Sequence, residues 1–281
     1  MSLSFNRIIA KVRRDKSPII PIIRLSGVIA ASAGPLRAGL SLPGVEKALA
    51  GAFGVKQAPA VAIVINSPGG AAVQSHLIFK RIRALAEEKG KRVIVAVEDV
   101  AASGGYMIAV AGDEIVVDAA SIVGSIGVVS AGFGFTGLIE KLGVERRVHT
   151  AGRSKVMLDP FRPEKEEDVE RLAALQGDVH AGFIELVKKR RPHLIDDPDI
   201  FSGAFWSGTR AVELGLADRI GDLREVLREK YGPDVRGLPI ALESRGWRRR
   251  LGLSTEATAT SVIDGALAAL DERLTWDRFG L

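Results

Sequence analysis

The sequence contains no cysteine among its 281 residues, so disulfide bonds, thiolate metal sites and cysteine nucleophiles are all excluded. Its four histidines lie far apart and lack the short spacings of zinc ligands, so we expect no metal and no cofactor. No apolar run reaches the ~18 residues that a transmembrane helix needs, and no signal-peptide pattern opens the chain. These absences predict a cytoplasmic protein.

Aromatic residues are also scarce, at 5% of the chain. The formal net charge is +5, but the basic residues gather near the two ends and at 188–191, without interleaved aromatics that could stack on bases. The charge therefore does not predict nucleic-acid binding. Residues 3–14 have the pattern of a short basic amphipathic helix, which would lie peripherally on the inner face of a membrane or dock on protein. Both interpretations stay open.

Alternating strand and helix patterns fill most of the remaining sequence. Continuous apolar runs at 60–66 and 92–98 predict buried strands, and residues 72–89 between them have helical periodicity. This alternation favours an α/β fold with a buried sheet. The chain divides into a basic N-terminal segment, a main domain and a C-terminal appendage: 1–18, 19–235 and 236–281.

The first candidate site is the turn NSPGG at residues 66–70, between a predicted strand and a predicted helix. Gly69 and Gly70 allow the backbone to turn sharply and to present N–H groups outward, and the helix start adds partial positive charge. Such a turn suits an oxyanion or a thioester carbonyl. It equally fits a tight connection without any chemistry.

The second candidate site is Ser103, in the motif ASGGY after the next predicted strand. Small neighbours would let a substrate backbone approach, and the Gly104 N–H would point the same way as the Ser103 hydroxyl. The alternative is an ordinary helix N-cap. No histidine is followed by an obvious orienting aspartate, so a Ser-His-Asp triad has no sequence support.

The base that a serine nucleophile needs could be Lys155, which ends the motif AGRSK after a strand-like run at 146–150. Burial of an amine disfavours its charged form, so a Lys155 desolvated by its apolar neighbours at 156–158 would lose its proton more easily. It could then accept the Ser103 proton. Composition alone favours the ordinary alternative, a solvated lysine in a surface loop.

Together these sites resemble the signal peptide peptidase A family of Ser–Lys serine peptidases. Five motifs occur in the family's order: INSPGG (65–70), ASGGY (102–106), GSIGVV (124–129), AGRSK (151–155) and FWSGTRAVELGLADRIG (205–221). The resemblance implies the Clp protease/crotonase-like α/β fold, built from ββα units with parallel sheet layers and flanking helices. It implies Ser103 as nucleophile, Lys155 as base, and oxyanion donors at Gly104 and the Gly69–Gly70 turn, preferably Gly70.

The resemblance also carries expectations about the surroundings of the site. Ser125 and Ser154 are candidates to orient the lysine amine. Short members of the family form ring-like homo-oligomers whose active sites are sometimes completed by neighbouring subunits, and we expect the same here. Val123 and Met107 depart from the family's usual threonine and tyrosine, and no N-terminal membrane anchor is visible. Expected substrates are signal-peptide remnants and unfolded or membrane-protein fragments.

Two other functions remain open. A crotonase-type acyl-CoA enzyme would use similar backbone donors with glutamates as acid and base; Glu98 is near the ASGGY turn, but no paired glutamate accompanies it. The other is a catalytically inactive scaffold that organises membrane proteins, against which the intact Ser103 and Lys155 argue.

Overall fold

The computed structural model describes residues 17–31, 39–152, 154–242, 273 and 275–280, and its centre is a single sheet. Six strands follow the order β6-β5-β3-β2-β1-β8, while β4 pairs with β3 and with β7. Every pair is parallel except β5–β6. The strands are β1 (Ile19–Ser26), β2 (Ala60–Ser67), β3 (Arg92–Ala102), β4 (Glu114–Val117), β5 (Ile122–Gly124), β6 (Phe205–Ser207), β7 (Arg219–Ile220) and β8 (Arg236–Ile240).

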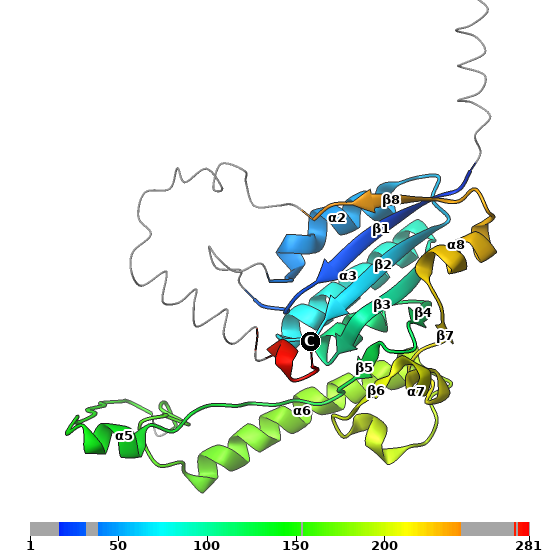
Figure 1. Ribbon diagram of the computed structural model, residues 1–281. Coiled ribbons are helices and arrows are strands. Elements are labelled where there is room, and N and C mark those ends of the chain that lie inside the picture. The colour runs from blue at the N-terminus through cyan, green and yellow to red at the C-terminus, as the bar shows by residue number, and fades with distance from the viewer. Residues whose placement is uncertain (1–16, 32–38, 153, 243–272, 274, 281) are drawn as a thin grey trace, which may run out of the picture.

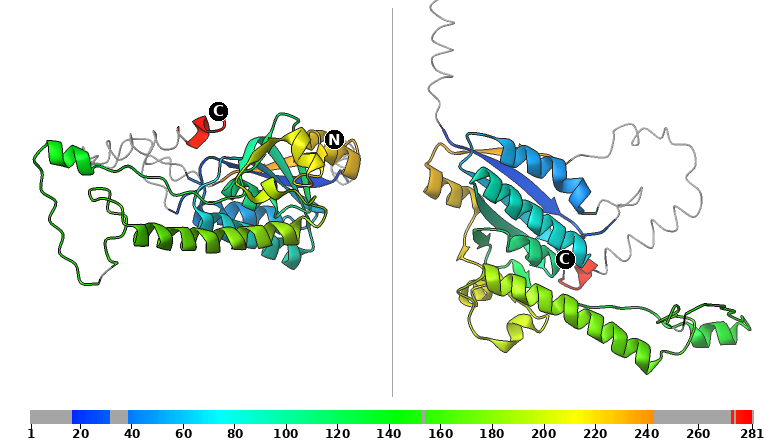
Figure 2. Two further views of the ribbon diagram at one scale, coloured as in Figure 1. Left: turned by 90° about the horizontal axis from the view of Figure 1, so that it is seen from below. Right: turned by 180° about the vertical axis from the view of Figure 1, so that it is seen from behind.

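Helices flank this sheet on both faces (Figures 1 and 2). They are α2 (Leu42–Gly54), α3 (Ala72–Lys89), α4 (Gly104–Ala109), α5 (Thr136–Lys141), α6 (Glu166–Arg190), α7 (Gly208–Glu213) and α8 (Leu223–Tyr231), with a 3-10 turn η1 at Pro198–Phe201. Val93 and Val95 of β3 join the main core with α2, α3 and α4, whereas Ile94 packs with α8 on the opposite face. This two-sided burial explains why the central strands read as continuous apolar runs.

The predicted α/β fold class is therefore confirmed, with a mainly parallel sheet and flanking helices. The helix expected at 72–89 has those bounds and ends at Gly90, whose left-handed φ of 60° suits a helix C-terminus. The expected strand at 146–150 is wrong: that segment is irregular and mostly exposed. It contains no strand because no neighbouring strand offers it backbone hydrogen bonds.

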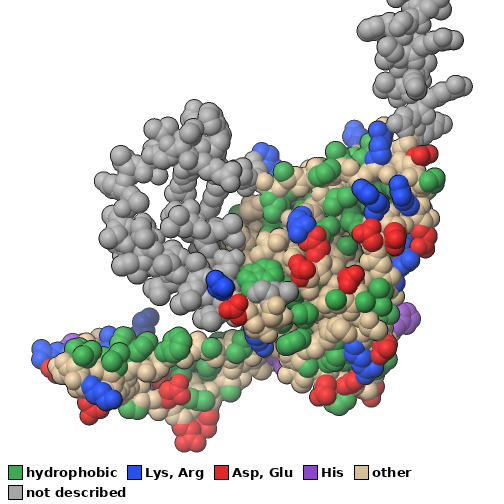
Figure 3. Space-filling model, in the orientation of Figure 1, with side chains coloured by type: hydrophobic (Ala, Val, Ile, Leu, Met, Phe, Trp, Pro, Cys, Tyr) green, Lys and Arg blue, Asp and Glu red, His purple; other side chains and the backbone are tan. Residues whose placement is uncertain are grey.

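An arm projects from the body of the molecule and consists of residues 128–165 with the N-terminal part of α6 (Figures 1 and 2). The buried residues of α6 are Phe183 and Val187, both near its C-terminal end. Many apolar side chains of the arm stay exposed, and Figure 3 shows hydrophobic side chains gathered along it. The arm is thus joined to the body mainly through the last turns of α6.

The structure describes only parts of the predicted N-terminal segment 1–18 and the predicted C-terminal appendage 236–281. The N-terminal helix expected at 3–14, within the segment 1–18, lies outside the described residues. The predicted appendage at 236–281 begins with β8, which pairs with β1 and so belongs to the main sheet. Near the other end, Phe279 is buried against Val100 and Ala102 of β3. Among the helices that the structure describes, none is both long enough and apolar enough to span a bilayer.

Candidate active site

Ser103 occupies the sharp turn between β3 and α4, in a backbone conformation that serine rarely adopts. Its φ is 51° and its ψ is −121°, outside the regions favoured by residues with a side chain. The turn is held by hydrogen bonds from the Ser103 N–H to the Gly124 carbonyl (2.8 Å) and from the Met107 N–H to the Ser103 carbonyl (2.9 Å). Strain of this kind persists only where the surroundings enforce it, and it is common at functional sites.

The side chain of Ser103 makes no capping hydrogen bond to the start of α4. The alternative in which Ser103 serves only as a helix N-cap therefore has no support from the geometry. Ser103 is half-buried, whereas the residues on either side of it, Ala102 and Gly104, are buried. The turn thus singles out this one residue for contact with a ligand.

The SPGG turn lies directly against Ser103, as the family resemblance implied by assigning oxyanion donors to both turns. A Cβ placed on Gly69 would lie 2.8 Å from the Ser103 Cβ and 2.9 Å from the Gly104 nitrogen. Gly104 is equally confined, because a Cβ there would meet the Ser75 Oγ at 2.3 Å. These glycines are required by close approach of the backbone segments as well as by turning.

Two backbone N–H groups beside Ser103 are available as donors. No hydrogen bond among the described residues uses the N–H of Gly70 or Gly104, although neighbouring groups do: Ala71 donates to the Ile29 carbonyl at 2.8 Å. Gly69 differs, since its N–H donates to the Ser67 Oγ at 3.3 Å. Of the predicted oxyanion donors, Gly70 and Gly104 therefore remain the candidates, and Gly69 provides the space.

The predicted lysine-orienting serines lie in different parts of the molecule. Ser125 is buried beside the turn of Ser103, with a positive φ of 52°, and its N–H donates to the Ala204 carbonyl at 2.7 Å. Ser154 lies next to Lys155 in a turn on the arm. Within one chain, the structure brings together Ser103, Gly69, Gly70, Gly104 and Ser125, and leaves Ser154 and Lys155 apart from them.

Lys155 is exposed, and the loop that carries it lies on the arm, well away from the β3–α4 turn (Figures 1 and 2). The expected desolvation by residues 156–158 is therefore not found in the described part of the chain, where these residues are partly buried but Lys155 is exposed. The loop is nevertheless ordered by Asp159, whose carboxylate accepts two hydrogen bonds from the Arg146 guanidinium, at 2.9 and 3.1 Å. These bonds hold the pKa of Asp159 below its ordinary value.

Glu98, the acid that an acyl-CoA enzyme would need, is paired with Arg24. Its carboxylate accepts a 2.6 Å hydrogen bond from Arg24 of β1, and burial raises its pKa although Arg24 opposes that effect. It lines a hollow of about 760 Å³ between the sheet and α8, together with Asp118 and Arg228. Nothing in this arrangement directs Glu98 toward the SPGG turn. Among the described residues, no group of three or more histidines and carboxylates could hold a metal ion.

Asn66 has a structural role that the sequence analysis does not predict, because its side chain links the end of β2 to β3. Its amide donates to the Asp99 carboxylate at 2.6 Å and accepts from the Val100 N–H at 3.2 Å. These bonds span a register shift, where Ile65 pairs with Val97 but Ser67 pairs with Ala101. Asn66 thereby fixes the bulged end of β3 that leads into Ser103. An asparagine at the end of a buried strand was the available signal.

Comparisons with known proteins relate the chain to peptidases. The model of peptidase family S49 matches residues 85–231. A putative protease of Synechocystis is 33% identical over 80% of this chain and 82% of its own length. The chloroplastic serine protease SPPA of Arabidopsis thaliana is 34% identical over 74% of this chain and 31% of its own. A solved membrane-bound stomatin-specific protease has 14% identity and a TM-score of 0.48, covering 81% of this chain and 99% of that one.

Two relatives from Brucella carry a different kind of name. A Brucella abortus protein named as the Na(+)/H(+) antiporter NhaA is 53% identical over 98% of this chain. The chain spans only 39% of that protein's length. A name given to the whole of a much longer protein does not carry ion transport over to the part that matches here.

Proposed function

We propose, from the premise that the chain belongs to peptidase family S49, that it is a serine peptidase with Ser103 as its nucleophile. The observation that carries the proposal is the strained backbone of Ser103 beside the N–H groups of Gly70 and Gly104, which donate to no described residue. A nucleophile held in this way, with donors nearby, is the arrangement that acyl transfer requires.

The proposed reaction begins when the Ser103 oxygen attacks a peptide carbonyl and its proton passes to a base. The carbonyl oxygen becomes an oxyanion that the Gly70 and Gly104 N–H groups stabilise, each by roughly 3 kcal/mol. The base then returns the proton to the leaving amine, and water hydrolyses the acyl-enzyme. Glycine at 69 and 104 lets the SPGG turn pack directly against the Ser103 turn, which brings the donor groups beside the nucleophile.

The proposed base is Lys155, brought to the Ser103 of a neighbouring subunit. Two features of the arm support an assembly: Lys155 is exposed on it, and so are apolar side chains such as Phe133 (78% exposed) and Val129 (71%). An apolar surface of this kind is typical of a protein–protein contact. A contact that covered the arm would remove water from the amine and favour its neutral form, as a general base requires.

We propose that the assembly is a ring-like homo-oligomer and that its substrates are unfolded polypeptides, such as signal-peptide remnants or membrane-protein fragments. The small residues around Ser103 suit an extended chain better than a folded protein. Residues 3–14 would hold the assembly peripherally on the inner face of a membrane. Ser125 and Ser154 would orient the amine once the arm and the nucleophile turn meet.

A serine-reactive fluorophosphonate probe, with the labelled peptide mapped, tests the nucleophile. We expect the label on Ser103, and we expect Ser103→Ala and Lys155→Ala each to abolish peptide hydrolysis without unfolding the protein. Ser202→Ala is the matched control, since Ser202 is an exposed serine whose hydroxyl bonds to Asp199 and Ala204 and not to the Ser103 turn. A label on another serine, or hydrolysis retained by Ser103→Ala, would refute the proposal. Hydrolysis retained by Lys155→Ala would refute the lysine base alone.

A further inference from the structure

Helix α6 acts as the support of the arm. It has 25 residues, so it is roughly 37 Å long at 1.5 Å per residue, yet its buried side chains are Phe183 and Val187 near one end. The partly buried Leu186 packs beside them, and the His180 ring forms a 3.0 Å hydrogen bond with the Ile126 carbonyl. These contacts lie within roughly two turns of α6, so they resist separation but fix the direction of so long a helix only loosely. The direction of the arm must therefore depend on further contacts at the C-terminal end of α6.

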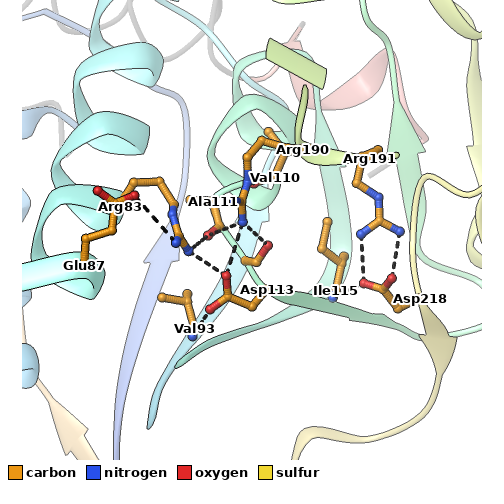
Figure 4. Close-up of polar contacts among 11 residues, drawn as sticks. Arg83, Glu87, Val93, Val110, Ala111, Asp113, Ile115, Arg190, Arg191 and Asp218 are labelled. Atoms are coloured by element: carbon orange, nitrogen blue, oxygen red, sulfur yellow. Dashed lines mark hydrogen bonds and ion pairs between the residues drawn. The ribbon is translucent and has the colours of Figure 1, made fainter. Parts of the chain in front are cut away.

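Arg190 supplies such contacts in the last turn of α6 (Figure 4). Its guanidinium donates to the Val110 carbonyl and to the Gly112 carbonyl, both at 2.9 Å, and to the Asp113 carboxylate at 3.3 Å. These groups directly follow α4. Arg83 of α3 reaches the same place, with bonds to the Ala111 carbonyl (3.0 Å) and to Asp113 (2.8 Å). The C-terminal carbonyl end of α4 is thus capped by two guanidinium groups.

This arrangement connects α6 to the nucleophile through one short element. Helix α4 has six residues, begins immediately after Ser103 and ends at the carbonyls that Arg190 binds. It is buried along its whole length, so it cannot rotate independently of the sheet. A planar guanidinium with several donors fixes orientation in a way that apolar contact does not.

The adjacent residue, Arg191, fastens the other side of the α6 terminus. It forms two 2.9 Å bonds to the Asp218 carboxylate and one of 2.8 Å to the Gly215 carbonyl. Asp218 in turn accepts from the Ile115 N–H of β4 at 2.7 Å. Figure 4 shows the two arginines directed to different partners, so the end of α6 is held at two separate points.

We infer that Arg190 is a positioning residue, which fixes the direction of α6 relative to the α4 helix of Ser103 and thereby sets where the arm presents Lys155. The kinetic consequence of this inference rests on the proposed function. Its structural consequence, the direction of α6, is independent of that function. Phe183 and Val187 attach the helix, Arg191 fastens its end at a second point, and Arg190 ties its direction to α4.

The structural consequence can be measured because the chain contains no native cysteine. Ala84→Cys on α3 and Ala174→Cys on α6 place two spin labels at exposed positions, one on the body and one on the arm. Labelled chains assembled with an excess of unlabelled chains report the distance within one subunit. We expect a narrow distance distribution with Arg190 present and a broadened one in Arg190→Gln.

The kinetic consequence is a lower kcat at an almost unchanged KM, because misplacing a catalytic group weakens the chemical step more than substrate binding. We expect Arg190→Gln to reduce kcat about tenfold or more, and Arg190→Lys, which keeps the charge, to recover part of both effects. Arg171→Gln is the matched control on the same helix, since Arg171 pairs only with Glu167 at the surface.

The outcomes separate the inference from the proposed function. If Arg190→Gln lowers only the free energy of unfolding, while the folded protein keeps the wild-type distance distribution and kcat, the inference is wrong. If the wild-type protein hydrolyses no peptide, the proposed function fails, and the distance measurement still decides whether Arg190 orients the arm. If Arg190→Gln does not fold, Arg190→Lys gives the same two readouts.

Discussion

Gly69 packs against Ser103 so closely that a Cβ at position 69 would lie 2.8 Å from the Ser103 Cβ. Gly69 also has a φ of 105°, which residues with a side chain rarely adopt. The nucleophile turn and the SPGG turn therefore form a single unit whose geometry depends on a missing side chain.

Gly69→Ala should disturb this unit in both activity and stability. We expect peptide hydrolysis to fall at least about tenfold and the free energy of unfolding to fall by about 1–3 kcal/mol, from strain and overlap. Gly51→Ala is the matched control, because Gly51 lies in α2 with no atom within 4 Å of the added Cβ. It should raise stability by about 0.5–1 kcal/mol. Urea unfolding and steady-state kinetics measure both, and equal behaviour of the two variants would contradict the packing argument.

Ser103→Gly should abolish hydrolysis while making the protein more stable. A glycine tolerates the φ of 51° that strains serine, so we expect a gain of about 1 kcal/mol in the free energy of unfolding. Ser202→Gly should do the opposite, since Ser202 has an ordinary φ of −80°, glycine adds unfolded-state entropy, and the hydrogen bonds of the Ser202 hydroxyl with Asp199 and Ala204 are lost. Thermal unfolding of the two variants gives the comparison. A destabilised Ser103→Gly would mean that the turn stores no strain.

Asp159 should control the order of the Lys155 loop in a pH-dependent way. Hydrogen bonding by Arg146 lowers the pKa of this carboxyl, so its stabilising effect is present above the ordinary value of 3.8 and is lost as the pH falls through the lowered value. At neutral pH, Asp159→Asn should therefore speed hydrogen exchange of residues 144–162 and reduce kcat. The wild type should approach the variant only in acid.

Glu145→Gln is the control for this loop, because Glu145 and its partner Arg147 are both exposed. It should leave exchange and kcat unchanged at neutral pH. If Asp159→Asn exchanges no faster than Glu145→Gln, the Asp159 contacts do not order the loop.

Phe279 should support the strand that leads to the nucleophile. It is buried against Val100 and Ala102, and its ring contacts that of Phe205 edge-on at 5.2 Å between centroids. We expect Phe279→Ala to increase hydrogen exchange at the end of β3 and to lower peptidase activity. Phe133→Ala, which removes an exposed ring on the arm, should leave the β3 amides unchanged. Unaltered exchange in Phe279→Ala would show that the C-terminal contact is dispensable.

The sequence was informative where structure follows from local pattern. The apolar runs of β2 and β3 and the periodicity of α3 predicted a strand–helix–strand unit, and the carboxyl ends of parallel neighbours necessarily meet. The contact between the SPGG turn and Ser103 follows from that topology. The close fit of Gly69 against Ser103 and the unused N–H groups of Gly70 and Gly104 could be recognised only in the structure.

Other features depend on partners far away in the sequence. Strands β5 and β6 have three residues each, too few for a periodic pattern, and pair Gly124 with Phe205 across a long insertion. Arg190 resembles any basic residue near a helix C-terminus until α4 is placed beside it. The surroundings of Lys155 could not be predicted from one sequence, since residues 156–158 are apolar and partly buried but leave the Lys155 side chain exposed among the described residues.

The arm is attached to the body mainly through the last turns of α6, so the sequences of the two parts can change independently during evolution. Residues added to or lost from the segment 128–165 would alter the reach of the arm without disturbing the packing of the sheet or the turn at Ser103. In the proposed assembly, the spacing between adjoining copies, and with it the width of the enclosed chamber, would then diverge among descendants while the turn at Ser103 stays the same.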